Sequence, residues 1–163
     1  MQVTREQFKT IFDKYFDDIR RYLYYRCGDE ALSTDLAQDT FMRIWEKDLV
    51  LLPGKDAGLL YKIAGDLFVS HTRRDKLRQE APERIRFESG SRTPEEELEM
   101  QELQEKYEKA LVKLPENQRI VFLMSRMEEL TYAEIASRLT ISVKAVEKRM
   151  SGALARLRKE INA

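Results

Sequence analysis

The sequence has few of the residues that carry most catalytic and metal-binding chemistry. It contains one cysteine, Cys27, and one histidine, His71, among 163 residues. A single cysteine excludes a disulfide framework, and one cysteine with one histidine cannot supply the ligands of a zinc site. A glycine-rich phosphate-binding loop is also missing, so we predict a protein that is not an enzyme, with no metal and no cofactor. Cys27 itself is open to two interpretations: a redox switch, or a small packing residue at a helix end.

Long hydrophobic runs are missing as well. The longest apolar candidate, residues 49–52, ends at Pro53 and Gly54 and is far shorter than the roughly 20 residues that cross a bilayer. The first ten residues, MQVTREQFKT, lack the apolar segment of a signal peptide. We therefore expect a cytoplasmic protein without membrane insertion.

The chain has no net charge, with 29 basic and 29 acidic residues, but these charges are unevenly distributed. Residues 62–78 include five basic and two acidic side chains, and residues 138–159 include seven basic ones and a single acid. Between these segments, residues 88–108 carry eight glutamates and two basic residues. Two basic segments on either side of an acidic one are compatible with nucleic-acid binding, which the total charge alone would conceal.

Apolar residues in the first part of the chain recur at steps of three and four, as in amphipathic helices. A capping box of Thr4 and Gln7 starts a first helix that ends near Gly28. A second helix starts within residues 29–33 and stops before Pro53, and a third runs from about residue 56 into the first basic segment. We predict that the three helices form one bundle. Its expected core positions include Leu36, Phe41, Ile44, Trp45, Leu59, Leu60, Ala64 and Phe68.

The helical periodicity fails at residues 79–93, where proline, serine and glycine accumulate as in a mobile connection. Thr93 and Pro94 then have the pattern of a helix cap and first turn. The expected apolar positions of this helix are Leu98, Leu103, Tyr107, Leu111 and Leu114. The sequence thus predicts an all-α fold of two small helical domains, residues 1–80 and 94–163, joined by a flexible linker at 81–93.

The last fifty or so residues have the spacing of a helix-turn-helix. Thr131 and Glu134 form a capping box that opens a short helix, residues 140–142 form a tight connection, and a helix from Val143 to about Ile161 follows. Small Ala136 lets the two helices approach closely. The second helix then projects from the domain and can enter the major groove of DNA. The candidate contacts to bases or phosphates are Ser142, Lys144, Glu147, Lys148, Arg149 and Ser151.

The alternative for this segment is an ordinary basic surface helix. DNA binding explains better why two caps, a short turn, a small residue at the crossing and a basic outer face occur together. Glu147 does not fit easily, because a carboxylate near phosphate is repelled unless it accepts a hydrogen bond from a cytosine amino group. Its role stays open.

Over nearly its whole length the chain resembles bacterial sigma-70-family factors of the extracytoplasmic-function group. The residues that carry the resemblance are Asp35-Leu-Ala-Gln-Asp-Thr-Phe41 with Trp45, Leu60-Tyr-Lys-Ile-Ala64, Leu114-Pro-Glu-Asn-Gln-Arg119 and Thr131-Tyr-Ala-Glu-Ile-Ala136. The resemblance implies a region 2 domain at residues 1–80, which binds core RNA polymerase and opens the minus-ten promoter element. It also implies a region 4 domain at residues 94–163, which reads the minus-thirty-five element.

The resemblance also assigns roles to individual residues. It implies that a stripe on the second helix docks on the clamp helices of the polymerase beta-prime subunit: Asp35, Gln38, Asp39 and Met42. The alternative interpretation of this stripe is an ordinary acidic face exposed to solvent. The implied minus-ten contacts are Tyr61, Lys62, Asp66, His71, Arg73 and Arg74. Taken alone, His71 is more typical of a surface residue than of a ligand. Gly65-Asp66 departs from the bulkier residue and asparagine that are usual in the family, and an ionised Asp66 accepts but does not donate hydrogen bonds.

The implied function is promoter-specific transcription initiation. The implied partners are core RNA polymerase, through its beta-prime clamp helices and beta flap, promoter DNA, and an anti-sigma factor. Two other functions stay open: a dimeric helix-turn-helix regulator that needs two-fold half-sites and no polymerase, and a protein-interaction module that has lost its DNA contacts. We also expect the free protein to fold its basic surfaces toward the glutamates of residues 95–108.

Overall fold

The computed structural model describes residues 2–75, 85–86 and 93–162, apart from the side chains of Glu96 and Glu97. These residues form seven helices and no strand, which confirms the predicted all-α class. The helices are α1 (Arg5–Cys27), α2 (Glu30–Glu46), α3 (Ala57–Arg74), α4 (Pro94–Lys113), α5 (Glu116–Glu128), α6 (Tyr132–Leu139) and α7 (Val143–Ile161). In the described part of the chain, no helix is both long and apolar enough to span a membrane.

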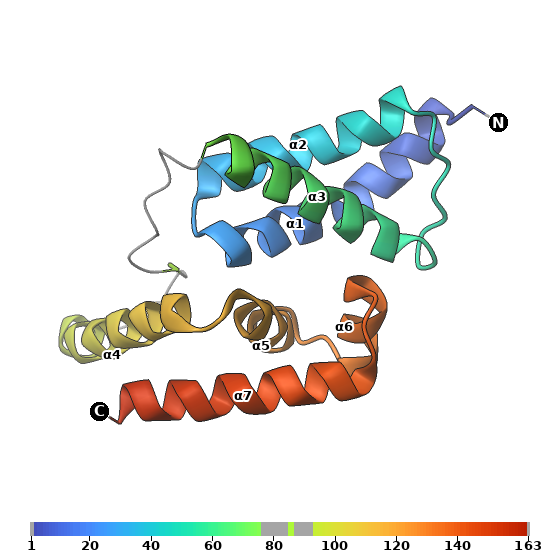
Figure 1. Cartoon of the computed structure of the whole chain (residues 1–163). Coiled ribbons are helices and arrows are strands. Elements are labelled where there is room, and N and C mark those ends of the chain that lie inside the picture. The colour runs from blue at the N-terminus through green and yellow to red at the C-terminus, as the bar shows by residue number, and fades with distance from the viewer. Residues whose placement is uncertain (1, 76–84, 87–92, 163) are drawn as a thin grey trace.

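The helices form two groups in space (Figure 1). Helices α1, α2 and α3 pack side by side in an amino-terminal bundle, whereas α4, α5, α6 and α7 form a carboxy-terminal one. The long α7 runs beneath α4 and α5, and the short α6 rises from its start toward α3. The helices therefore form two small bundles, and the domain bounds at residues 80 and 94 stay a prediction.

Local capping sets the boundaries of the first two helices. The Thr4 hydroxyl accepts from the Gln7 amide at 3.1 Å, and the Gln7 side chain accepts from the Thr4 amide at 3.0 Å, so the predicted capping box is confirmed. Helix α1 ends at Gly28, which adopts a left-handed conformation with φ of 69° that favours glycine. Asp29 then caps α2 by accepting from the Leu32 amide at 3.1 Å.

The core of the amino-terminal bundle is built largely from the predicted positions. Leu36, Phe41, Ile44, Leu60, Ala64 and Phe68 are all buried. The prediction was wrong for Trp45, which is 44% exposed and packs its ring edge-on against Phe8 with centroids 5.3 Å apart. It was also wrong for Leu59, which is 40% exposed.

The core of the carboxy-terminal bundle centres on α5. Its side chains Val121, Leu123 and Met124 are fully buried, and α7 contributes Val146 and Ala153. Among the described residues, the second half of α4 contributes Ala110 and Leu111 to this core, and Leu114 follows directly after the helix. Leu98 and Leu103, which the periodicity assigned to the core, are 63% and 52% exposed.

The two bundles contact each other directly. Helix α1 packs against α5, and α3 packs against α6. The predicted flexible linker lies outside the described residues except for Ile85, Arg86 and Thr93. Ile85 is fully buried, and the Arg86 amide donates to the Tyr24 hydroxyl at 2.9 Å, so this point of the connection is held against α1.

Candidate nucleic-acid interface

Helices α6 and α7 have the geometry of a helix-turn-helix. The Thr131 hydroxyl and the Glu134 carboxylate each accept from the other's backbone amide at 3.1 Å, which confirms the capping box at the start of α6. Thr140 ends α6 in a left-handed conformation with φ of 56°. The Ser142 hydroxyl then accepts from the Ala145 amide at 3.1 Å and caps α7. Local side-chain chemistry thus produces the tight turn that the sequence predicts.

Packing between the two helices leaves one side of α7 open. Ala136 and Val146 are buried where α6 and α7 meet, and Ile141 packs partly buried beside them. The side chains of Lys144, Glu147, Lys148 and Ser151 are exposed, as is the cap residue Ser142. These five predicted DNA contacts are therefore accessible near the amino-terminal end of α7. Their roles stay predictions.

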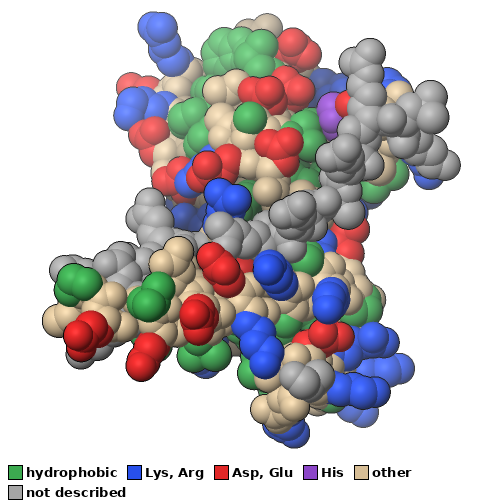
Figure 2. Space-filling model, turned by 90° about the vertical axis from the view of Figure 1, so that its left-hand side faces the viewer, with side chains coloured by type: hydrophobic (Ala, Val, Ile, Leu, Met, Phe, Trp, Pro, Cys, Tyr) green, Lys and Arg blue, Asp and Glu red, His purple; other side chains and the backbone are tan. Residues whose placement is uncertain are grey.

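Arg149 differs from the other predicted contacts of α7. It is half-buried and lines a cavity of about 570 Å³ that also involves Tyr22 and Arg26 of α1 and Glu116 of α5. Helix α7 therefore lies beside the amino-terminal domain. Figure 2 shows that Lys and Arg side chains gather at one side of the carboxy-terminal bundle and acidic side chains at the other, as the uneven charge along the sequence suggested.

Most of the predicted minus-ten residues lie on the surface of α3. Lys62, Asp66, Arg73 and Arg74 are exposed. His71 is half-buried, and its Nε2 lies 3.7 Å from the Asp75 carboxylate. Lys62 and Asp66 line a cavity of about 460 Å³ between α3 and α6. A basic surface is thus present on α3, and the contacts assigned to it stay predictions.

Tyr61 is an exception, because it is only 3% exposed. Its hydroxyl accepts from Arg138 of α6 at 3.1 Å, and its ring packs edge-on against Tyr22 with centroids 5.1 Å apart. Burial raises the pKa of the Tyr61 hydroxyl, and the nearby Arg138 partly opposes this. In this structure, Tyr61 contacts the carboxy-terminal domain and is not available to DNA.

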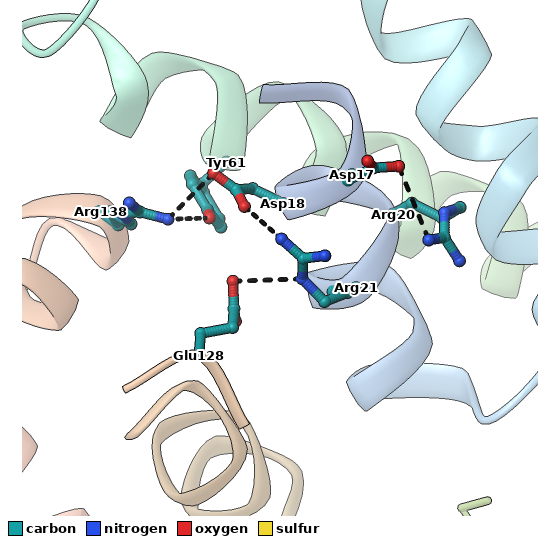
Figure 3. A network of polar contacts seen from close by, with 7 residues as sticks. All are labelled: Asp17, Asp18, Arg20, Arg21, Tyr61, Glu128 and Arg138. Carbon is teal, nitrogen blue, oxygen red and sulfur yellow. Dashed lines mark hydrogen bonds and ion pairs between the residues drawn. The ribbon is translucent and has the colours of Figure 1, made fainter. Parts of the chain in front are cut away.

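Charged side chains from three helices surround this contact (Figure 3). The Asp18 carboxylate of α1 accepts from Arg138 at 3.3 Å and from Arg21 at 2.6 Å. Arg21 also faces Glu128, the last residue of α5, at 3.5 Å. Burial raises the pKa of the Glu128 carboxyl, and Arg21 opposes this. The network links both domains, and sequence reasoning missed it.

The predicted polymerase-binding stripe lies on the outer side of α2. Asp35, Gln38, Asp39 and Met42 are all exposed, whereas Leu36, Ala37, Thr40 and Phe41 of the same helix are buried. The stripe is thus a continuous surface with acidic and apolar members. This placement is what docking requires, and the docking itself stays a prediction.

The unusual Gly65 has a clear structural consequence. A Cβ atom at this position would lie 3.2 Å from Arg26 Nη1 and 3.3 Å from the Tyr22 hydroxyl. Arg26 in turn stacks over the Phe68 ring at 4.5 Å and pairs with Glu116 of α5. The missing side chain therefore leaves room for an arginine that reaches the other domain.

The structure favours a packing role for Cys27. Its Sγ lies 3.3 Å from the Ser33 hydroxyl at the junction of α1 and α2. Burial raises the pKa of the Cys27 thiol, which disfavours the reactive thiolate. Among the residues that the structure describes, no group of three or more His, Cys, Asp or Glu side chains could hold a metal ion.

Comparisons with known proteins match both domains. The family model for sigma-70 region 2 matches residues 11–78, and the model for sigma-70 region 4 matches residues 104–157. The chain is 27% identical to the ferric citrate uptake sigma factor FecI of Escherichia coli, over 90% of this chain and 86% of that protein. It is 26% identical to the ECF RNA polymerase sigma factor SigM of Bacillus subtilis, over 94% of this chain and 91% of that protein.

A solved structure has a similar fold. It is the sigma factor RpoE in complex with the anti-sigma factor NepR from Bartonella quintana, with a TM-score of 0.68 and 21% sequence identity. The match covers 96% of this chain and 97% of that chain. The similarity extends over both helical bundles.

Proposed function

The chain belongs to the sigma-70 family of RNA polymerase sigma factors, in its extracytoplasmic-function group, and from this we propose how its surfaces direct promoter-specific transcription initiation. Residues 1–80 serve as region 2 and residues 94–163 as region 4. The observation that carries the proposal is that both family models match in this order, while the start of the capped helix α7 stays open to solvent. The polymerase performs the chemistry, and the chain supplies recognition in the cytoplasm.

Two surfaces share promoter recognition in this proposal. The basic surface of α3 holds the separated minus-ten strand, because strand separation exposes phosphates that Arg73 and Arg74 can neutralise. The amino-terminal end of α7 enters the major groove of the minus-thirty-five element and presents Lys144 and Lys148. Region 4 also contacts the polymerase beta flap.

Control by an anti-sigma factor belongs to the same proposal. The structure with a similar fold is a complex of a sigma factor with an anti-sigma factor. We infer that this chain has such a partner, whose binding would compete with core polymerase.

A run-off transcription assay tests the function. Purified chain added to core RNA polymerase should give promoter-dependent transcripts that core alone does not give. DNA binding by the chain without core, and no transcripts, would support the dimeric regulator. If the chain neither gives transcripts with core nor binds DNA without it, the protein-interaction module remains as the function.

Charge reversal in the α2 stripe tests polymerase docking. D39K should weaken binding to core polymerase by about tenfold or more, because like charges placed together at an interface cost several kcal/mol. A pull-down with core measures the loss, and circular dichroism checks that the fold is kept. E102K, the same change at an exposed position of α4, is the matched control. Equal binding by both variants would remove the stripe from the interface.

A further inference from the structure

One carboxylate interrupts the basic face of α7. The buried side chains of Val146, Met150 and Ala153 pack one side of this helix against its own domain. Four side chains near the start of the helix are exposed and follow the pattern i, i+3, i+4 and i+7: Lys144, Glu147, Lys148 and Ser151. Positions with this spacing share one helix face, so the four side chains meet a ligand of α7 together. On such a face the glutamate opposes binding to phosphates, whereas the two lysines favour it.

The Glu147 side chain is not engaged within the protein. On α1, Lys9 and Asp13 show the usual arrangement of exposed charges on a helix, an ion pair of 2.8 Å between positions i and i+4. Glu147 differs from this. In the part of the chain that the structure describes, its carboxylate takes part in no ion pair and no side-chain hydrogen bond, although Lys144 and Lys148 are close along the helix. The carboxylate is therefore available to a ligand that approaches this face.

A carboxylate in the major groove of DNA has few suitable partners. When ionised it only accepts hydrogen bonds. Guanine presents two acceptors in the groove, and thymine presents an acceptor and a methyl group, so neither base offers a donor to Glu147. Adenine presents the N6 donor beside the N7 acceptor, which repels the second carboxylate oxygen. Cytosine presents the N4 amino group with no acceptor beside it, so its edge complements Glu147 best.

The lysines beside Glu147 suit the other base of the same pair. The guanine that pairs with a cytosine presents its N7 and O6 acceptors in the major groove, and lysine is a common donor to these two atoms. Lys144 lies about one helical turn before Glu147, and Lys148 follows it directly, so the carboxylate has a donor on each side. A pair of guanine and cytosine therefore matches both signs of charge on this face.

We propose that Glu147 makes α7 select a cytosine at one position of the minus-thirty-five element, while a lysine beside it contacts the paired guanine. The proposal rests on the proposed function and names the base that this site requires. Guanine or thymine at that position leaves the carboxylate without a donor, and adenine places an acceptor against it. Glu147 therefore weakens binding to most sequences and spares those with the cytosine, so a residue that opposes general DNA binding increases selectivity.

A selection from random DNA tests this assignment. Duplexes randomised across both promoter elements are incubated with core polymerase and the chain, and the retained duplexes are sequenced. Wild type should enrich cytosine at one minus-thirty-five position by at least about fivefold over each other base. E147Q should change the preference at that position to adenine, because an amide accepts from N6 and donates to N7. E147A should lose the preference there, and both variants should keep the preferences of wild type at the other positions.

Controls separate a base contact from a structural role and from the proposed function. E102Q, the same change at an exposed glutamate of α4, should keep the cytosine preference. A glutamate with only a structural role would change stability without changing cytosine preference into adenine preference. Base preferences of E147Q and E147A identical to those of wild type would overturn the proposal. Wild type that gives promoter-dependent run-off product without any cytosine preference would contradict this proposal alone, whereas no product from any retained duplex would contradict the proposed function as well.

Discussion

Arg119 shows how a buried cation is accommodated in this protein. Its guanidinium donates to four carbonyl groups that two helix ends leave without intrahelical donors. Burial lowers the pKa of Arg119, but an arginine stays charged at any ordinary pH. The planar guanidinium group, with its several N–H donors, suits this position because the acceptor carbonyls come from two domains.

Replacing Arg119 by lysine should destabilise the fold while keeping the charge. A lysine ammonium has three donors on a flexible stem and cannot satisfy four spread carbonyls, so R119K should lower the free energy of unfolding by about 2–4 kcal/mol. Urea denaturation measures this. R126K makes the same change at an exposed arginine of α5 and should stay within about 0.5 kcal/mol of wild type. If the two variants unfold alike, Arg119 does not hold the domains together.

At the scale of a helix, sequence patterns predict the helix ends well and the buried faces less well. The caps at Thr4, Thr131 and Ser142 were predictable because each depends on residues no more than three positions away. Leu98 and Leu103 were assigned to the core by their spacing, but α4 extends beyond the helices that would cover them. Periodicity identifies an apolar face without showing what packs on it.

The cap of α7 gives a prediction for a single helix. S142A removes the hydroxyl that accepts from the Ala145 amide and should destabilise the chain by about 1 kcal/mol. The loss should appear in thermal unfolding, and binding to minus-thirty-five duplex should fall because the start of α7 frays. S151A, also at an exposed serine of α7, should keep or slightly raise stability, since alanine favours helix interiors. An S142A variant as stable as S151A would show that the turn does not need the cap.

At the scale of the whole molecule, the two bundles were predictable from the sequence and their contact was not. Arg138 and Glu128 lie on helices whose periodicity is explained within their own domain, so nothing local marks them as bridging residues. The described ion pairs between domains use Glu116 and Glu128 of α5 and Asp18 of α1. The expected attraction of basic surfaces to the glutamates of residues 95–108 stays a prediction.

The Glu128 carboxyl makes the contact between the two domains of the whole molecule depend on pH. Burial at the domain contact raises its pKa above the ordinary value of 4.5. The groups that face it are Asp18, Arg21 and Tyr25 of α1, Tyr61 of α3 and Arg138 of α6. Because the carboxyl holds this proton more tightly when the domains are in contact, the contribution of Glu128 to the contact is fully present below about pH 4.5. It is lost as pH rises through the raised pKa.

Fluorescence energy transfer between dyes at K47C and K159C, exposed positions in the two domains of a C27S chain, measures how closely the domains approach between pH 4.5 and 8. Transfer should decrease as pH rises. E128Q resembles the protonated carboxyl at every pH, so transfer in this variant should stay high and lose the slope. His71 is unchanged in E128Q, so a slope that persisted there would come from another group. That result would show that the buried carboxyl at the domain contact does not control how closely the two domains pack.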